Sequence, residues 1–241
     1  MEVIVVKNYQ ELSEKAFEML KALIIEKPDA TIGFATGSTP VGLYQLMVKD
    51  HLINQTSYQK MTAFNLDEYI GLPQNHPESY YTFMRTNLFN TLDVNFDQVY
   101  IPAGDARDIV AEGQAYEVLL DKYPIDFQIL GIGTNAHIGF NEPNTPLDSL
   151  TGVVDLTEDT IKANARFFEN DPNQVPTQAI SMGIASILKA KKIVLLASGA
   201  SKAEAIYNTI HGPVTAEVPS SALQNHPNVT LIIDEAAASK L

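Results

Sequence analysis

The sequence predicts an α/β protein built on one mostly parallel, open β-sheet with helices on both faces. Short β-branched and apolar runs alternate with longer stretches of helical periodicity from end to end. The apolar runs lack a clean alternation of polar and apolar residues, which indicates strands buried on both faces, as in parallel sheets. No linker rich in Gly, Ser or Pro divides the chain, so we expect a single Rossmann-like domain over residues 1–241.

Seven segments have the composition expected of such strands. Each is short, rich in Val, Ile, Leu or Phe, and separated from the next by a helical pattern or by turn residues. They cover residues 3–6, 31–35, 61–66, 98–101, 127–130, 193–197 and 229–233.

Six segments between these strands show helical patterns. Asn8, followed three residues later by Glu11, is typical of a capping box, and Pro28 ends the helix that it begins. Thr39 can cap the second helix and Pro40 can start it, because the missing N–H of proline costs nothing at the first helical position. The expected helices cover residues 9–26, 41–50, 78–90, 111–122, 183–189 and 202–210.

Charge and composition exclude several classes of function. The chain has 16 basic and 29 acidic residues and a net charge of −13, so it would repel the phosphate backbone of a nucleic acid. The absence of cysteine excludes disulfides, zinc–thiolate sites, iron–sulfur clusters and thiol catalysis. No stretch reaches the roughly 18 apolar residues of a membrane helix, and Glu2 stands where a signal peptide carries positive charge. We expect a cytoplasmic protein without nucleic-acid or membrane partners.

Two turns at the ends of predicted strands could bind an anion. In an open parallel sheet, ligands bind beyond the carboxyl ends of the strands. The first turn contains Gly37, Ser38 and Thr39, and the second ends in Lys202. Glycine permits tight turning, hydroxyls donate hydrogen bonds, and a helix N-terminus offers free N–H groups. The first turn could instead be an ordinary turn with a helix cap, and it lacks the lysine of a nucleotide P-loop. In the second turn, Lys202 could equally be a surface lysine in solvent.

Two adjacent acids follow the third predicted strand. Neighbouring side chains of an extended segment point to opposite sides, so only one of Asp67 and Glu68 should face a cleft. A carboxylate at that position could act as a general base. A turn-forming carboxylate in solvent is an equally good interpretation of the same residues.

A glycine-rich loop follows the fifth predicted strand. Gly131, Gly133 and Ala136 fit the loose dinucleotide-binding pattern, but Pro143 and Pro146 leave no room for the helix that this motif requires.

The same loop holds a histidine–carboxylate pair. The carboxylate of Glu142 could orient the imidazole of His137 for acid–base chemistry near neutral pH. A structural histidine is the plainer alternative, and two candidate ligands alone make a weak metal site.

Five longer motifs are spread along the chain: NLDEYIGLP at residues 65–73, HPESYY at 76–81, HIGFNEP at 137–143, ANARFF at 163–168 and QVP at 174–176. Together they resemble the glucosamine-6-phosphate deaminases, and the resemblance extends over essentially the whole chain. The related 6-phosphogluconolactonases share the fold but lack this combination of motifs.

The resemblance implies an enzyme of amino-sugar catabolism, within N-acetylglucosamine degradation, that needs no metal and no cofactor. It would convert glucosamine 6-phosphate and water into fructose 6-phosphate and ammonia by aldose–ketose isomerisation and deamination, and we class it as a hydrolase and isomerase acting on an amino-sugar phosphate. Asp67 would take the proton from C2 and return it at C1, and His137 would open the pyranose ring. Asn135 and Glu142 would position that histidine. Some members carry Asp at the position of Asn135, and an amide supplies no such negative charge.

The resemblance also implies a phosphate site and a mode of regulation. A segment over residues 155–176 would close on the substrate. Longer members are hexamers activated by N-acetylglucosamine 6-phosphate, whereas Gly152 and Val154 stand here at positions that carry Arg and Lys in those members, so we expect a non-allosteric form. The substrate phosphate would be held by Gly37, Ser38, Thr39, Arg166 and Lys202.

Three functions remain open at this point. Besides the deaminase, the chain could be a 6-phosphogluconolactonase-like hydrolase or a sugar-phosphate-binding regulator without catalysis. Whether it is a monomer or a homo-oligomer is left open as well.

Overall fold

The computed structural model describes all 241 residues and contains a seven-stranded main sheet and a three-stranded small sheet. The strand order of the main sheet is β1-β10-β9-β6-β2-β3-β5, and all neighbouring pairs are parallel. The predicted α/β fold class is confirmed, and each of the seven predicted strands lies within one residue of its observed bounds. These are β1 (Glu2–Val6), β2 (Thr31–Phe34), β3 (Thr62–Asn65), β5 (Val99–Tyr100), β6 (Phe127–Leu130), β9 (Ile193–Ala197) and β10 (Val229–Asp234).

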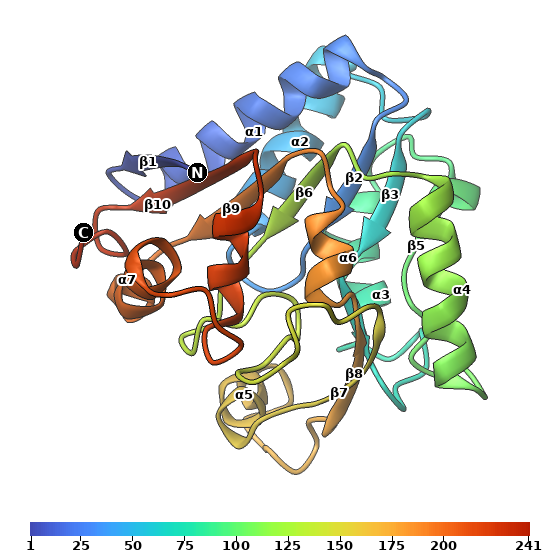
Figure 1. Ribbon diagram of the computed structural model, residues 1–241. Helices are drawn as coiled ribbons and strands as arrows, with labels where there is room; N and C mark the ends of the chain where they lie inside the picture. The colour runs from blue at the N-terminus through green and yellow to red at the C-terminus, as the bar shows by residue number, and fades with distance from the viewer.

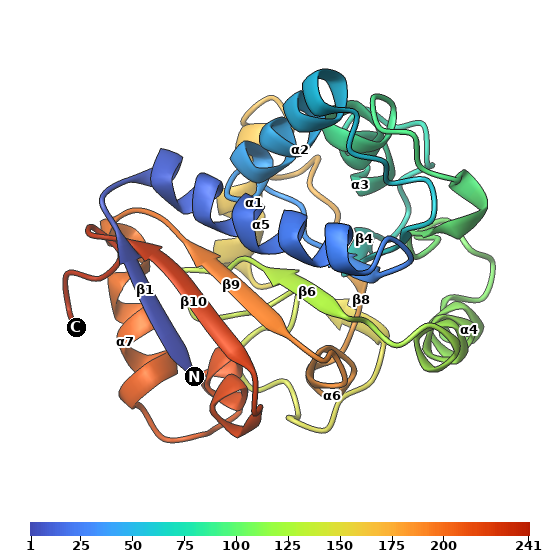
Figure 2. The ribbon, with the colours of Figure 1, turned by 90° about the horizontal axis from the view of Figure 1, so that it is seen from above.

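Helices cover both faces of the main sheet. Figure 2 shows α1 and α2 above the sheet and α6 and α7 below it, so the central strands are buried on both sides, as their continuous apolar sequences require. All six predicted helices are present. They are α1 (Tyr9–Glu26), α2 (Val41–Asn54), α3 (Tyr80–Met84) continued by a π-helical turn (Arg85–Phe89), α4 (Ile109–Lys122), α6 (Ile184–Leu188) and α7 (Ala203–His211). None of them combines the length and the apolar character that crossing a bilayer requires.

The two predicted helix caps have different outcomes. The side chain of Asn8 accepts a hydrogen bond from the backbone N–H of Glu11, so the cap of α1 is confirmed. The prediction that Thr39 caps α2 is wrong, because Pro40 itself is the cap residue and no side chain caps that helix. Thr39 instead lines a cavity.

The small sheet was not predicted from the sequence. Its strands β4 (Asp67–Tyr69), β8 (Gln178–Ser181) and β7 (Gly152–Asp155) pair antiparallel. The connection from β7 to β8 contains α5 (Glu158–Asn164) and a 3₁₀ turn (Ala165–Phe167). Figure 1 shows β7, β8 and α5 together at the end of the molecule toward which the central strands β6 and β9 point.

Short 3₁₀ segments also occur at Phe96–Gln98, Ala200–Lys202 and Pro219–Asn225.

A second, smaller apolar cluster packs beneath the small sheet and α5, separate from the core of the main sheet. It is formed by Tyr69, Phe140, Leu156, Ala165, Phe168, Val175 and Ala179.

Candidate active site

A cavity of about 570 Å³ lies beyond the carboxyl ends of the parallel strands. The residues that follow β2, β3, β6 and β9 all contribute to its wall, which is where a parallel sheet places a ligand. Eight of the nine residues proposed from the sequence line it, and the ninth, Glu142, contacts the lining residue His137. The eight are Gly37, Ser38, Thr39, Asp67, Asn135, His137, Arg166 and Lys202.

Both predicted anion turns reach this cavity, and two cations accompany them. Gly37 has a φ of +93°, a conformation that glycine adopts without strain, and it presents Ser38 and Thr39 to the cavity. The Lys202 ammonium donates to the carbonyl of Ile132 at 2.7 Å. Burial and, secondly, the charge of Arg166 lower the pKa of Lys202. Two neighbouring cations in a partly buried site favour a doubly charged anion such as a phosphate.

Asp67 is the buried acid of the cavity. It begins β4 and only 5% of its surface is exposed. Burial, together with the charge of Glu68, raises the pKa of the Asp67 carboxyl to about 8, so it binds a proton far more readily than an ordinary aspartate. Gly139 lies beside Asp67 with a φ of +57°, a left-handed conformation that glycine adopts without strain.

Glu68 points away from the cavity, as the alternation of an extended segment predicts. Its carboxylate accepts hydrogen bonds from the backbone N–H groups of Tyr69, Tyr80 and Tyr81, each at 2.9 Å. Glu68 therefore ties β4 to the start of α3 and holds the adjacent Asp67 in place.

His137 stands at the cavity wall with Glu142 behind it. The Nδ1 atom of His137 lies 3.3 Å from the Glu142 carboxylate. Gly133 leaves room for the imidazole, because a β-carbon there would lie 2.5 Å from the ring. Asn135 joins the two residues: its amide donates to Glu142 at 2.7 Å, and its carbonyl oxygen accepts from the backbone N–H of His137 at 3.3 Å.

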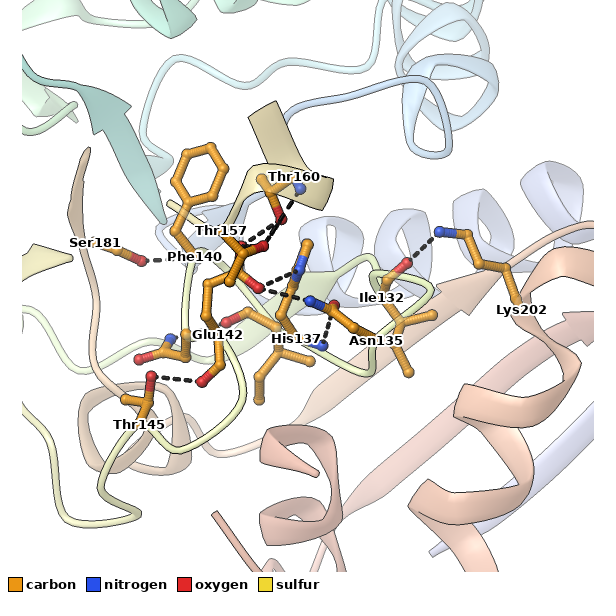
Figure 3. A network of polar contacts seen from close by, with 12 residues as sticks. Ile132, Asn135, His137, Phe140, Glu142, Thr145, Thr157, Thr160, Ser181 and Lys202 are labelled. Carbon is orange, nitrogen blue, oxygen red and sulfur yellow. Dashed lines mark hydrogen bonds and ion pairs between the residues drawn. The ribbon is translucent and has the colours of Figure 1, made fainter. Parts of the chain in front are cut away.

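Glu142 remains ionised in this environment. Burial opposes the charge, but His137 and the hydrogen bonds from Thr160 and Asn135 outweigh it and lower the pKa of Glu142 to about 2. The amide at position 135 thus contributes a hydrogen-bond donor to the carboxylate instead of a second negative charge. The imidazole of His137 therefore lies beside the carboxylate of Glu142, which the amide of Asn135 holds from another side (Figure 3).

Two hydroxyls that bond the other carboxylate oxygen of Glu142 were not predicted from the sequence. Thr160 and Thr157 both donate to its second carboxylate oxygen. Thr157 is also the N-cap of α5. A threonine followed by two acidic residues is typical of a helix start, so this pattern could have indicated the helix.

No helix follows β6 directly, so the dinucleotide-binding pattern is not realised and its glycines shape a loop around His137. What the cavity offers is a buried carboxyl of raised pKa, a carboxylate-supported imidazole and a cationic anion site. Such a set suits proton transfer on a small phosphorylated molecule.

Comparison with known proteins agrees with this geometry. Residues 7–232 match the family described as glucosamine-6-phosphate isomerases/6-phosphogluconolactonase. The chain is 52% identical to a glucosamine-6-phosphate deaminase of Clostridioides difficile over 100% of this chain and 97% of the relative, and 53% identical to one of Lactobacillus delbrueckii subsp. bulgaricus over 100% of both chains.

Solved structures give the same result. A monomeric glucosamine-6-phosphate deaminase superposes with a TM-score of 0.97 at 45% identity, covering 100% of both chains. A 6-phosphogluconolactonase from Trypanosoma brucei superposes with a TM-score of 0.81 at 20% identity, covering 100% of this chain and 98% of that one, which shows a shared fold. The chain belongs to the family of glucosamine-6-phosphate isomerases and 6-phosphogluconolactonases.

Proposed function

We propose that this protein is a glucosamine-6-phosphate deaminase of amino-sugar catabolism, acting in the cytoplasm as one domain over residues 1–241. It would convert glucosamine 6-phosphate and water into fructose 6-phosphate and ammonia. The observation that carries the proposal is that one cavity holds the buried carboxyl of Asp67, the imidazole of His137 and the cations Arg166 and Lys202. The full-length identity of about 50% to relatives of that name supports it.

Each group then has a distinct task. Arg166, Lys202 and the turn at Gly37 hold the phosphate and so fix the sugar along the cavity. His137 moves a proton between the ring oxygen and the anomeric oxygen, which opens the pyranose to the aldehyde. Asp67 removes the proton from C2 and delivers it to C1, which gives the ketose imine. Addition of water at C2 and loss of the amine as ammonia complete the balance.

Two other functions are less well supported. The 6-phosphogluconolactonases that superpose on this chain are only 14–21% identical, so they share the fold alone. A regulator without catalysis would have no use for a buried carboxyl whose pKa is raised to about 8. The general term hydrolase is also too coarse, because the family is described by its isomerases and the proposed reaction joins isomerisation to deamination.

Two parallel incubations separate the three functions. The purified protein is incubated with glucosamine 6-phosphate, where ammonia and fructose 6-phosphate are measured, and separately with 6-phosphogluconolactone, where release of acid is measured. The deaminase releases both in equal amounts. Acid release from 6-phosphogluconolactone without ammonia from the amino sugar would indicate the lactonase, and binding without either product would indicate the regulator.

Loss of either cation should weaken phosphosugar binding. We expect Arg166→Ala and Lys202→Ala each to raise the KM for glucosamine 6-phosphate about ten- to a hundred-fold, because a hydrogen bond to a charged group is worth roughly 1.5–3 kcal/mol. Unphosphorylated glucosamine should be affected little. Lys191→Ala serves as the control, since Lys191 pairs with Asp126 and does not line the cavity. Unchanged KM in both variants would place the phosphate elsewhere.

We also expect hyperbolic kinetics that N-acetylglucosamine 6-phosphate leaves unaltered, apart from competition at the active site. At β7, Gly152 and Val154 offer no charge to a phosphate. The nearby Lys189 is already paired with Glu117 at 3.1 Å and with a second acid. Initial rates across substrate concentrations, with and without the acetylated sugar, test this. A sigmoidal curve that becomes hyperbolic on addition of that sugar would contradict it.

A further inference from the structure

The segment that carries Arg166 also contacts the carboxylate behind the catalytic histidine. Helix α5 runs from Glu158 to Asn164, and Arg166 lies in the turn that follows it directly. Thr157 and Thr160, at the start of the same helix, bind Glu142. One short element therefore reaches the anion site with one end and the support of His137 with the other.

The Glu142 carboxylate receives all of its hydrogen bonds from side chains. Its Oε2 atom faces Asn135 and His137, and its Oε1 atom accepts from Thr160 and Thr157 (Figure 3). No backbone N–H reaches this buried carboxylate, unlike Glu68, which three backbone groups fix. The orientation of Glu142 therefore depends on where α5 lies.

Thr160 is the more deeply buried of the two donors to Oε1. Its side chain is only 5% exposed, and its hydroxyl donates to Glu142. Thr157 donates to the same oxygen at 3.3 Å and is also the cap of α5, since its hydroxyl accepts from the backbone N–H of Thr160 at 3.3 Å. A change at Thr157 would thus disturb the helix itself, whereas removal of the Thr160 hydroxyl takes away the donor to Glu142 and the acceptor that Thr157 bonds at 3.1 Å.

We propose that Thr160 is a positioning residue that couples the anion site to ring opening. This rests on the proposed function. When a phosphate binds Arg166, it fixes the turn after α5 and thereby the helix. Thr160 then holds the Glu142 carboxylate in the orientation that supports the imidazolium form of His137 during proton transfer. A sugar without a phosphate leaves α5 less restrained, so part of the binding energy of the phosphate is used in catalysis.

The test compares three variants of the full-length protein. Thr160→Val keeps the shape but removes the hydroxyl, and Thr160→Ser restores it. Thr230→Val is the matched control, because Thr230 is also buried and donates at 3.1 Å to a carboxylate, that of Glu2 on the edge strand β1, and does not line the cavity. For each we measure kcat with glucosamine 6-phosphate and the inhibition constant of inorganic phosphate, a probe of the anion site alone.

We expect Thr160→Val to lower kcat about ten-fold or more, with the inhibition constant of phosphate changed less than about two-fold. Thr160→Ser should recover most of kcat, and Thr230→Val should match the unchanged protein. A purely structural role would alter phosphate binding and kcat together and would not be rescued by serine. An unchanged kcat in Thr160→Val, in a protein that does release ammonia, overturns the coupling. If the unchanged protein releases no ammonia, the proposed function itself fails.

Discussion

Replacement of Asp67 by asparagine is expected to abolish exchange of the C2 hydrogen of glucosamine 6-phosphate with solvent and to lower kcat by at least about a hundred-fold. The amide has the shape of the acid but cannot accept the proton. KM should change little, because the phosphate is held by Arg166 and Lys202 at another part of the cavity wall. Deuterium incorporation followed by NMR, together with ammonia release, measures both effects.

The raised pKa of Asp67 adds a pH dependence to this result. The base acts in its ionised form, so kcat/KM should fall as the pH drops below about 8 and the carboxyl takes up a proton. Any activity that Asp67→Asn retains should not show this fall of kcat/KM at low pH. Asp50→Asn is the control, since Asp50 is equally buried but pairs with Lys21 away from the cavity. Near-normal deamination in Asp67→Asn would remove this residue from the role of base.

His137→Gln is expected to slow turnover of the cyclic sugar by about a hundred-fold or more, because glutamine cannot move a proton between the two oxygens of the ring. The reverse reaction, started from fructose 6-phosphate and ammonia, uses the open-chain form of the ketose and should be affected less. Comparison of the two initial rates separates ring opening from the later steps.

A second histidine provides the control for this substitution. His226 is buried and bonds the carbonyl of Ala190 at 2.7 Å, but it does not line the cavity, so His226→Gln should leave the ratio of the two rates unchanged. Equal loss in both directions for His137→Gln would indicate that His137 supports the loop structurally and does not act on the ring.

The main sheet could be predicted because its signal is local. Its central strands are buried on both faces, so each appears as a continuous apolar run between helical patterns. The small sheet has no such signal. Its strand β4 has three residues, two of them acids, and β7 alternates between half-buried and exposed positions. Both strands pair with β8, which follows them in the sequence and is distant from β4, and both depend on the smaller apolar cluster beneath the sheet.

In the candidate site, too, some residues could be predicted from local sequence patterns and others could not. Glycines, hydroxyls and charged residues directly after strands were enough to indicate Asp67, His137 and the two anion turns, because parallel strands bring their carboxyl ends to one edge. Arg166 came only from the resemblance to a known family, and the role of Thr39 as a helix cap was wrong. Thr160 was missed because its importance comes from a contact with Glu142, eighteen residues earlier, that no local pattern encodes.

The strand order of the main sheet also bears on how the polypeptide is made. On the ribosome β1 is synthesised before the other strands, yet its strand partner is β10, the last of them to be made. Helix α1 packs against β9 and β10 as well. The nascent polypeptide therefore carries its first strand without its sheet partner until β10 has been made, and α1, which can already pack against α2, still lacks its contacts with β9 and β10. The main sheet is completed only after residue 229 has been made, so the interval before that point is when β1 and the part of α1 that packs on β9 and β10 are exposed to aggregation.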